Sequence, residues 1–166
     1  ADDSDFDGLT DREEIFTYGT NPFLADTDGD GISDSDEINS LFHPAKDDTD
    51  GDGLKDNEEL TVYFTDALNV DTDSDGVTDF AEVSTYGSFP RAVDSDGDGL
   101  TDSNEVFLGT NPRSADTDSD GMDDKFEKDK SLNPTSASDA AQDLDGDGLS
   151  NLTEYQWGVS ISVSNG

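Results

Sequence analysis

The sequence predicts an irregular, mostly loop fold with short helices, arranged as an elongated array of tandem repeats without a conventional hydrophobic core. Two observations carry this prediction. The 166 residues include 43 acidic and 8 basic side chains, a formal charge of −35, and only 30% are hydrophobic. Such a chain has little apolar surface to bury. The acidic residues also recur in one short pattern at a nearly constant spacing, as in repeat proteins.

The repeated unit is a loop of twelve residues with the pattern D-x-D-x-D-G-φ-x-[DN]-x-x-E, where φ is apolar. Successive loops start 23, 22, 23, 23, 22 and 27 residues apart. We interpret residues 1–157 as seven tandem repeats and residues 158–166 as a β-prone tail or a linker to a following domain. The loops are residues 3–14, 26–37, 48–59, 71–82, 94–105, 116–127 and 143–154.

A short helix is predicted to begin near the ninth position of each loop. An apolar residue usually follows the final Glu and another comes about three residues later, as Ile15 and Tyr18 do, which suits one face of a helix. Glycines then stand where the helix would end, and Asn-Pro pairs force an extended return. Each repeat is therefore expected to be a loop, a helix of about two turns and an extended segment.

The last two repeats depart from this pattern. Lys128 replaces the apolar residue after the sixth loop, and four extra residues lie within residues 131–142, so we expect the array to bend or loosen there. In the tail, Val159, Ile161 and Val163 alternate with serines, which is the pattern of a half-buried strand.

The loop residues are suited to Ca²⁺, which takes six to eight oxygen ligands. Positions 1, 3 and 5 supply carboxylates, Gly at position 6 permits a sharp turn, and position 7 offers a backbone carbonyl. Position 9 acts through water and Glu at position 12 closes the shell with both oxygens. Mg²⁺ demands a stricter octahedron, and Zn²⁺ is disfavoured because the chain has no Cys and only His43.

We therefore expect a calcium-stabilised array that holds about seven or more Ca²⁺ ions, with no further cofactor. The predicted ligands are Asp3, Asp5, Asp7, Leu9, Asp11, Glu14, Asp26, Asp28, Asp30, Ile32, Asp34, Glu37, Asp48, Asp50, Asp52, Leu54, Asp56, Glu59, Asp71, Asp73, Asp75, Val77, Asp79, Glu82, Asp94, Asp96, Asp98, Leu100, Asp102, Glu105, Asp116, Asp118, Asp120, Met122, Asp124, Glu127, Asp143, Asp145, Asp147, Leu149, Asn151 and Glu154.

These loops are EF-hand-like, but a repeat of 22 or 23 residues has no room for a helix on both sides of the loop. The strings ADTDGDGISDSDE, VDSDGDGLTDSNE and YGTNP instead resemble thrombospondin type 3 repeats, in their bacterial, cysteine-free form. The resemblance covers roughly residues 2–157. It implies Ca²⁺-dependent wrapping around a metal core, in stalks of extracellular surface, adhesion or matrix proteins.

Our leading functional hypothesis is a calcium-rigidified stalk or spacer of a secreted or cell-surface protein. The alternative is a calcium-dependent adhesive, matrix or filament-forming module. We expect no catalysis, because every carboxylate pair is one of seven copies. Partners are calcium and either neighbouring domains of a longer chain or other copies of this one. The charge argues against nucleic acid, and no apolar run reaches the length of a membrane span.

Overall fold

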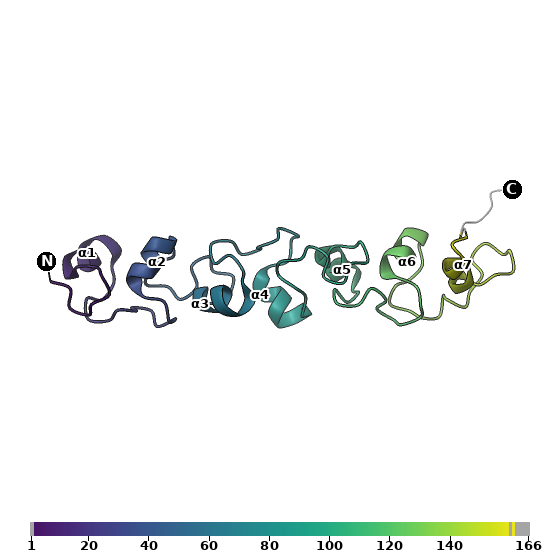
Figure 1. Cartoon of the computed structure of the whole chain (residues 1–166). Helices are drawn as coiled ribbons and strands as arrows, with labels where there is room; N and C mark the ends of the chain where they lie inside the picture. Colours follow the sequence, from purple (N-terminus) through teal and green to yellow (C-terminus); the bar gives the residue numbers. More distant parts are fainter. Residues whose placement is uncertain (1, 160, 162–166) are drawn as a thin grey trace.

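The structure is a computed structural model that describes residues 2–159 and 161. The repeats follow one another along a single direction, with α1 and α7 at opposite ends of the array (Figure 1). Most described residues lie in turns and loops, and no strand occurs among them. The predicted fold class, an elongated array of loops and short helices, is confirmed.

Every α-helix in the described part of the chain begins at the ninth position of a loop, as predicted. The residue before it, at position 8, is the N-cap, and Ser33 shows why this position is polar: its hydroxyl accepts a hydrogen bond from the Asp36 N–H. The elements are α1 (Asp11–Glu13), η1 (Glu14–Tyr18), α2 (Asp34–Ser40), α3 (Asp56–Glu58), η2 (Glu59–Tyr63), α4 (Asp79–Ala81), η3 (Glu82–Tyr86), α5 (Asp102–Leu108), α6 (Asp124–Lys130) and α7 (Asn151–Trp157).

The helices end on a residue in the left-handed conformation. Gly19, Gly87, Gly109 and Gly158 take this role, which confirms the predicted stops. Leu41, Phe64 and Ser131 occupy the same place with φ of 70°, 59° and 62°. The geometry of the helix end is thus kept even where glycine is absent.

The difference between 22- and 23-residue spacing is absorbed inside the helix. The three repeats followed by a 23-residue step are those in which an α turn continues into a π turn, namely η1, η2 and η3. The two repeats followed by a 22-residue step have a regular seven-residue helix, α2 or α5. One extra residue widens the last turn to i→i+5 hydrogen bonds, so that each repeat still leaves its helix at a left-handed residue.

The loops close on themselves through one backbone hydrogen bond. In all seven repeats the N–H of position 9 donates to the carbonyl of the residue just before position 1, for example from Asp34 to Ala25 at 3.0 Å. This bond brings the start of the helix against the start of its own loop. The carboxylates of positions 1, 3 and 5 lie between these two points and converge on one another.

Few apolar side chains are buried in the described part of the chain, and most of them stand at position 7. Leu54, Val77, Leu100 and Met122 are buried there. The expected apolar helix face is only partly buried, since Ile15 and Leu60, among the residues that follow the loop Glu, are 53% and 44% exposed. The largest fully buried side chains are otherwise the loop Glu and position-9 side chains, so the interior of the array is mainly acidic.

The longer connection before α7 neither bends the array in Figure 1 nor lies loose. The Leu152 N–H donates to the Ala140 carbonyl at 3.1 Å. The Tyr155 hydroxyl donates to Asp123 at 2.7 Å, and the rings of Tyr155 and Phe126 lie 4.6 Å apart. Our expectation of a bend or a loosened segment was wrong, because these contacts tie the seventh repeat to the sixth.

The C-terminal segment is described at two of its three apolar positions. Val159 is 46% exposed, whereas Ile161 is only 3% exposed and lies in no strand. The predicted alternating strand falls otherwise on residues 160 and 162–166, which lie outside the described residues. Of the two described apolar side chains of this segment, one is therefore buried and one is partly exposed.

Candidate metal centre

The carboxylates of positions 1, 3 and 5 converge within each loop. In the first five loops, one carboxylate oxygen from each of these positions lies within 4.8 Å of the others. Hydrogen bonds from the loop backbone hold them there. Asp26 accepts from the N–H groups of Gly29 and Gly31 at 2.7 and 3.1 Å, and Asp30 accepts from the Ile32 N–H at 2.7 Å. The sequence places these groups together because a single residue separates each carboxylate from the next.

Two backbone positions make this turn possible. Position 6 is Gly throughout, with φ near +106° at Gly31, a conformation that other residues avoid. Position 4 is also left-handed in all seven loops, including Phe6 and Ser74, whose φ values are 67° and 64°. Sequence reasoning found the first position and missed the second, although Gly fills position 4 in four of the seven loops.

The Glu at position 12 turns inward from the first turn of each helix. All seven, Glu14 through Glu154, are 0% exposed. Each has at least one carboxylate oxygen without a hydrogen-bond partner, and in the first six loops the Oδ2 atom of position 3 is also buried without one. Buried oxygens left without a donor are costly. These orphaned oxygens are what a bound cation would satisfy.

The raised pKa values of the buried carboxylates also favour a bound cation in the acidic loops. Burial, followed by repulsion from neighbouring Asp carboxylates, raises the pKa of Glu37 and Glu82 to about 8 and that of Glu14 to about 7. The same causes raise the pKa of Asp50 and Asp73, at position 3, to about 6. The pockets hold negative charge unfavourably, and no basic side chain is among these causes.

The Asp at position 9 has a structural role that the sequence argument did not include. In loop 2, Asp34 accepts from both the N–H and the hydroxyl of Thr27, each at 2.7 Å. The first six loops share this pair of bonds, because position 2 is Thr or Ser in each. The position-2 hydroxyl was therefore a functional position that we missed, and its recurrence in six loops was the available signal.

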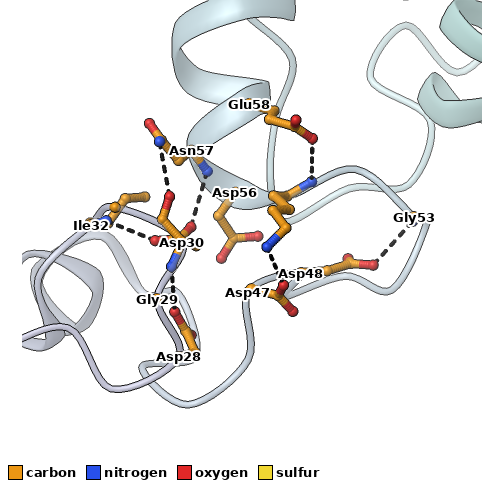
Figure 2. A network of polar contacts seen from close by, with 12 residues as sticks. Asp28, Gly29, Asp30, Ile32, Asp47, Asp48, Gly53, Asp56, Asn57 and Glu58 are labelled. Carbon is orange, nitrogen blue, oxygen red and sulfur yellow. Dashed lines mark hydrogen bonds and ion pairs between the residues drawn. The ribbon is translucent and has the colours of Figure 1, made fainter.

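Position 5 links each of the first five loops to the next repeat. The Asp30 Oδ2 atom accepts from the Asn57 N–H at 3.1 Å, and the Asn57 amide donates to the Asp30 carbonyl at 2.9 Å (Figure 2). The same N–H to Oδ2 bond joins Asp7 to Ser35, Asp52 to Phe80, Asp75 to Ser103 and Asp98 to Lys125. One carboxylate therefore belongs to a loop and, at once, to the start of the following helix.

The position-9 Asp of the following repeat also approaches the preceding loop. Figure 2 shows the Asp56 side chain between Asp30 of loop 2 and Asp48 of its own loop, and both charges act on its pKa. Asp34, Asp56 and Asp79 are accordingly 0% exposed, while Asp11, which has no preceding repeat, is only half-buried. The loops are thus acidic centres shared between neighbours. That the position-7 carbonyl is a Ca²⁺ ligand stays a prediction.

Two kinds of comparison place these repeats among known proteins. The pattern of the family described as "Bacterial TSP3 repeat", the bacterial thrombospondin type 3 repeat, matches four stretches of this chain, and no curated protein matches it. The matched stretches are residues 3–25, 26–40, 48–62 and 94–115.

Among solved structures, this chain is similar to two domains named "Biofilm associated protein - B domain" and "Biofilm associated protein - BSP domain". The first is 44% identical over 27% of this chain and 11% of that chain, with a TM-score of 0.27. The second is 46% identical over 26% of this chain and 7% of that chain, with a TM-score of 0.26. None of the described helices has the length and apolar character needed to cross a membrane.

Proposed function

We propose that the chain, four stretches of which match the bacterial thrombospondin type 3 repeat, is a calcium-binding rod that serves as a stalk or spacer of an extracellular protein. The proposal has three parts, which are the ion, the rod and the location. The acidic centres support the binding of an ion, and the contacts between repeats support the rod. The calcium affinity typical of such sites supports the extracellular location.

The observation that carries the proposal is the row of buried carboxylate oxygens without partners. An anion is buried at high cost unless a cation or hydrogen-bond donors neutralise it. Only two ion pairs occur among the described residues, Lys55 with Asp47 and Lys125 with Asp129, and their side chains are between 37% and 54% exposed. They lie outside the acidic centres, so neither pair neutralises the buried carboxylates, and a bound cation would supply the missing charge.

The oxygen-only donor set favours Ca²⁺. Several carboxylates in a flexible loop match its high coordination number, whereas Mg²⁺ retains water and requires a strict octahedron. We propose the residues at positions 1, 3, 5, 7 and 12 as direct ligands, with position 9 as a supporting group. Seven ions would lower the formal charge from −35 to about −21.

The rod follows from the hydrogen bonds given above, which join adjacent repeats within the described part of the chain, as in other solenoid-like arrays. Because position 5 belongs to one centre and to the next helix, an ion in each centre fixes the angle between neighbours. Extracellular calcium modules bind with dissociation constants of roughly 10⁻⁴–10⁻³ M. Sites of that affinity fill outside the cell and stay empty at cytosolic calcium levels, which supports an extracellular location.

A calcium titration tests the ion. We expect low helicity in chelator, a cooperative gain in helical circular dichroism on adding Ca²⁺, and about seven ions bound per chain by calorimetry. Mg²⁺ should have a much weaker effect. A spectrum that does not change between chelator and millimolar Ca²⁺ would remove the basis for a structural metal.

Small-angle X-ray scattering tests the rod. A compact domain of this length has a radius of gyration of about 15 Å, and an unfolded chain about 40 Å. In millimolar Ca²⁺ we expect a value clearly above the compact one, with the pair-distance distribution of a rod. In chelator the distribution should become that of an expanded coil. A compact value in Ca²⁺ would contradict the spacer.

Adhesion or assembly is the second candidate, because large apolar side chains stay exposed along the rod. Phe16 and Phe107, at equivalent positions after their loops, are 79% and 88% exposed, and Trp157 is 67% exposed. Light scattering in millimolar Ca²⁺ compares the intact chain, a Phe16→Ser/Phe107→Ser variant and a chain lacking residues 159–166. Calcium-dependent assembly lost in either variant would favour this candidate, and a monomer throughout favours the spacer.

A further inference from the structure

The junction between the sixth and seventh repeats lacks two groups that the earlier junctions use. At the preceding junction, the Thr117 hydroxyl accepts from the Asn111 N–H at 2.8 Å and donates to Asp124 at 2.7 Å. In the seventh repeat, position 2 is Leu144 and position 9 is Asn151. The hydroxyl and the carboxylate are therefore both missing where the longer connection, residues 131–142, enters.

Asp139 stands in this place. Its Oδ2 atom accepts from the Asn133 N–H at 2.7 Å, six residues earlier in the chain, as the Thr117 hydroxyl does from Asn111. The Asn151 amide donates to the Asp139 carbonyl at 2.9 Å. A carboxylate at position 151 could not donate this bond, which accounts for Asn at that position.

The other carboxylate oxygen of Asp139 has no partner. Asp139 is 8% exposed, and its Oδ1 atom is buried without a hydrogen bond. Both oxygens of Glu127 and the Oδ2 atom of Asp120, in the sixth loop, are buried and unpartnered as well. The equivalent atom of Asp98 accepts from the Lys125 N–H. At the longer connection, the Oδ2 atom of Asp120 is therefore left without a hydrogen-bond partner, and the Oδ1 atom of Asp139 is a second such oxygen.

The charge of Asp139 acts on the sixth loop. After burial, repulsion from Asp120, Asp118, Asp139 and Asp124, in that order, raises the pKa of Glu127 to about 8. For Glu105 the repulsive charges include Asp124, the position-9 carboxylate of the next repeat. The charge of Asp139 therefore acts on Glu127 of the sixth loop as the charge of Asp124 acts on Glu105 of the fifth, whereas Asn151 carries no charge.

We propose that Asp139 is a further carboxylate ligand of Ca²⁺ in the sixth loop, supplied by the inserted segment in place of the position-9 carboxylate that the seventh repeat lacks. This inference rests on the proposed calcium function. It assigns a ligand outside the twelve-residue loop pattern. The four additional residues then have a chemical purpose, because they carry a carboxylate to a centre that would otherwise be one charge short.

Calcium titration of the ¹⁵N-labelled full chain reads each loop separately. The Gly121 N–H donates to Asp116 at 2.9 Å, and the Gly99 N–H donates to Asp94 at 3.0 Å, so their amide resonances report the sixth and fifth loops. For Asp139→Asn we expect the Ca²⁺ midpoint at Gly121 to rise about tenfold, the scale by which ligand charge and supporting groups tune metal sites. The midpoint at Gly99 should not move.

Two further variants separate binding from folding. Asp139→Ser retains an acceptor for the Asn133 N–H, as the Thr or Ser of other repeats does. It should raise the Ca²⁺ midpoint at Gly121 as Asp139→Asn does. Asp129→Asn removes a charge of the same sign from an exposed side chain of α6 and should leave both midpoints unchanged.

An unchanged Gly121 midpoint in Asp139→Ser would overturn the proposal, and so would an equal shift at Gly99, which would make Asp139 a packing residue. If no position-6 glycine of the unmodified chain responds to Ca²⁺, the proposed function fails instead.

Discussion

At the scale of single residues, the structure divides the five acidic positions into different tasks. Position 1 and position 5 carboxylates satisfy loop N–H groups, and position 9 holds the position-2 hydroxyl. Position 12 is left with unpartnered oxygens in all seven repeats. The sequence analysis assigned these positions roles toward an ion, but not the hydrogen bonds that each of them accepts. Their hydrogen bonds indicate at which positions a substitution would remove a bound ion and at which positions it would lower the stability of the fold.

Glu82→Gln and Asp79→Asn test this division in the fourth repeat. Glu82 has a buried unpartnered Oε2, so Gln should lower the number of bound Ca²⁺ ions by one in calorimetry. Asp79 accepts from the Thr72 N–H and hydroxyl at 2.9 and 2.6 Å. Asn places a donor there, and we expect a loss of about 1–3 kcal/mol in unfolding free energy with the stoichiometry unchanged.

The exposed Asp36→Asn variant is the control for both changes and should alter neither quantity. Loss of one ion from both Glu82→Gln and Asp79→Asn would show that position 9 is a direct ligand. It would also show that its hydrogen bonds with position 2 are secondary.

Position 4 of the loop carries conformational strain wherever it is not Gly. Gly97→Ala should lower the unfolding free energy in Ca²⁺ by about 1 kcal/mol, because φ is +83° and an added Cβ meets nothing within 4 Å. Ser74→Gly, at the same position with φ 64°, should change it by a similar amount in the opposite direction, reduced by the greater freedom of Gly in the unfolded chain. Chemical denaturation in saturating Ca²⁺ measures both, and the same sign for both would contradict the strain.

At the scale of the element, the helix accommodates a one-residue difference between repeats. Residues 14–22 read EIFTYGTNP and residues 105–112 read EVFLGTNP. They differ in length by one residue, and the first lies in and after η1 whereas the second lies in and after α5. In both, a Thr hydroxyl after the left-handed Gly reaches the loop Glu, from Thr20 to Glu14 at 3.4 Å and from Thr110 to Glu105 at 3.5 Å. The π turn therefore keeps the repeat in register.

Deleting Thr17 should convert the first repeat to the shorter form. The remaining EIFYGTNP has the length of the α5 segment, so we expect a regular α-helix and an unfolding temperature in Ca²⁺ within a few degrees of the unmodified chain. Deleting the exposed Phe107 leaves that segment one residue short and should destabilise it clearly. Thermal denaturation by circular dichroism compares the two, and equal losses would show that the π turn is required in its own right.

At the scale of the whole molecule, charge controls folding. The metal-free fold has to bury carboxylates whose pKa is raised from 4.5 to about 8 at Glu59, Glu105 and Glu127. Their protonation therefore favours the folded, metal-free chain. This stabilisation is complete below about pH 4.5 and is lost as the pH rises through about 8. Under the proposed function, calcium would act in the opposite direction, because it would bind the ionised form.

Acid should consequently replace calcium in part. In metal-free buffer we expect more helical circular dichroism at about pH 5.5 than at about pH 9, where the buried carboxylates ionise. In limiting Ca²⁺ the midpoint of the calcium titration should rise on acidification, because protons compete for the same oxygens. Light scattering is the control for association as the pH approaches the isoelectric point of 4.1. A metal-free spectrum that is independent of pH would contradict this coupling.

The sequence by itself determined the repeat, its register, the start of each helix at position 9 and most helix ends. These features depend on contacts within about twelve residues of one chain, and glycine, proline and acidic periodicity record them directly. It also indicated the acidic centres, because oxygen donors that recur seven times at the spacing of a cation-binding loop are typical of a repeated metal site.

Only the tertiary structure decided how neighbouring repeats share their carboxylates. The bond from Asp30 to Asn57 spans 27 residues, and no periodic pattern distinguishes it from a contact with solvent. Asp139 lies outside every loop, so its place beside the sixth centre follows from the path of the inserted segment. The exposure of the apolar residues after each loop also depends on the tertiary structure. A narrow rod offers a helix one neighbour on each side and leaves its outer face in water.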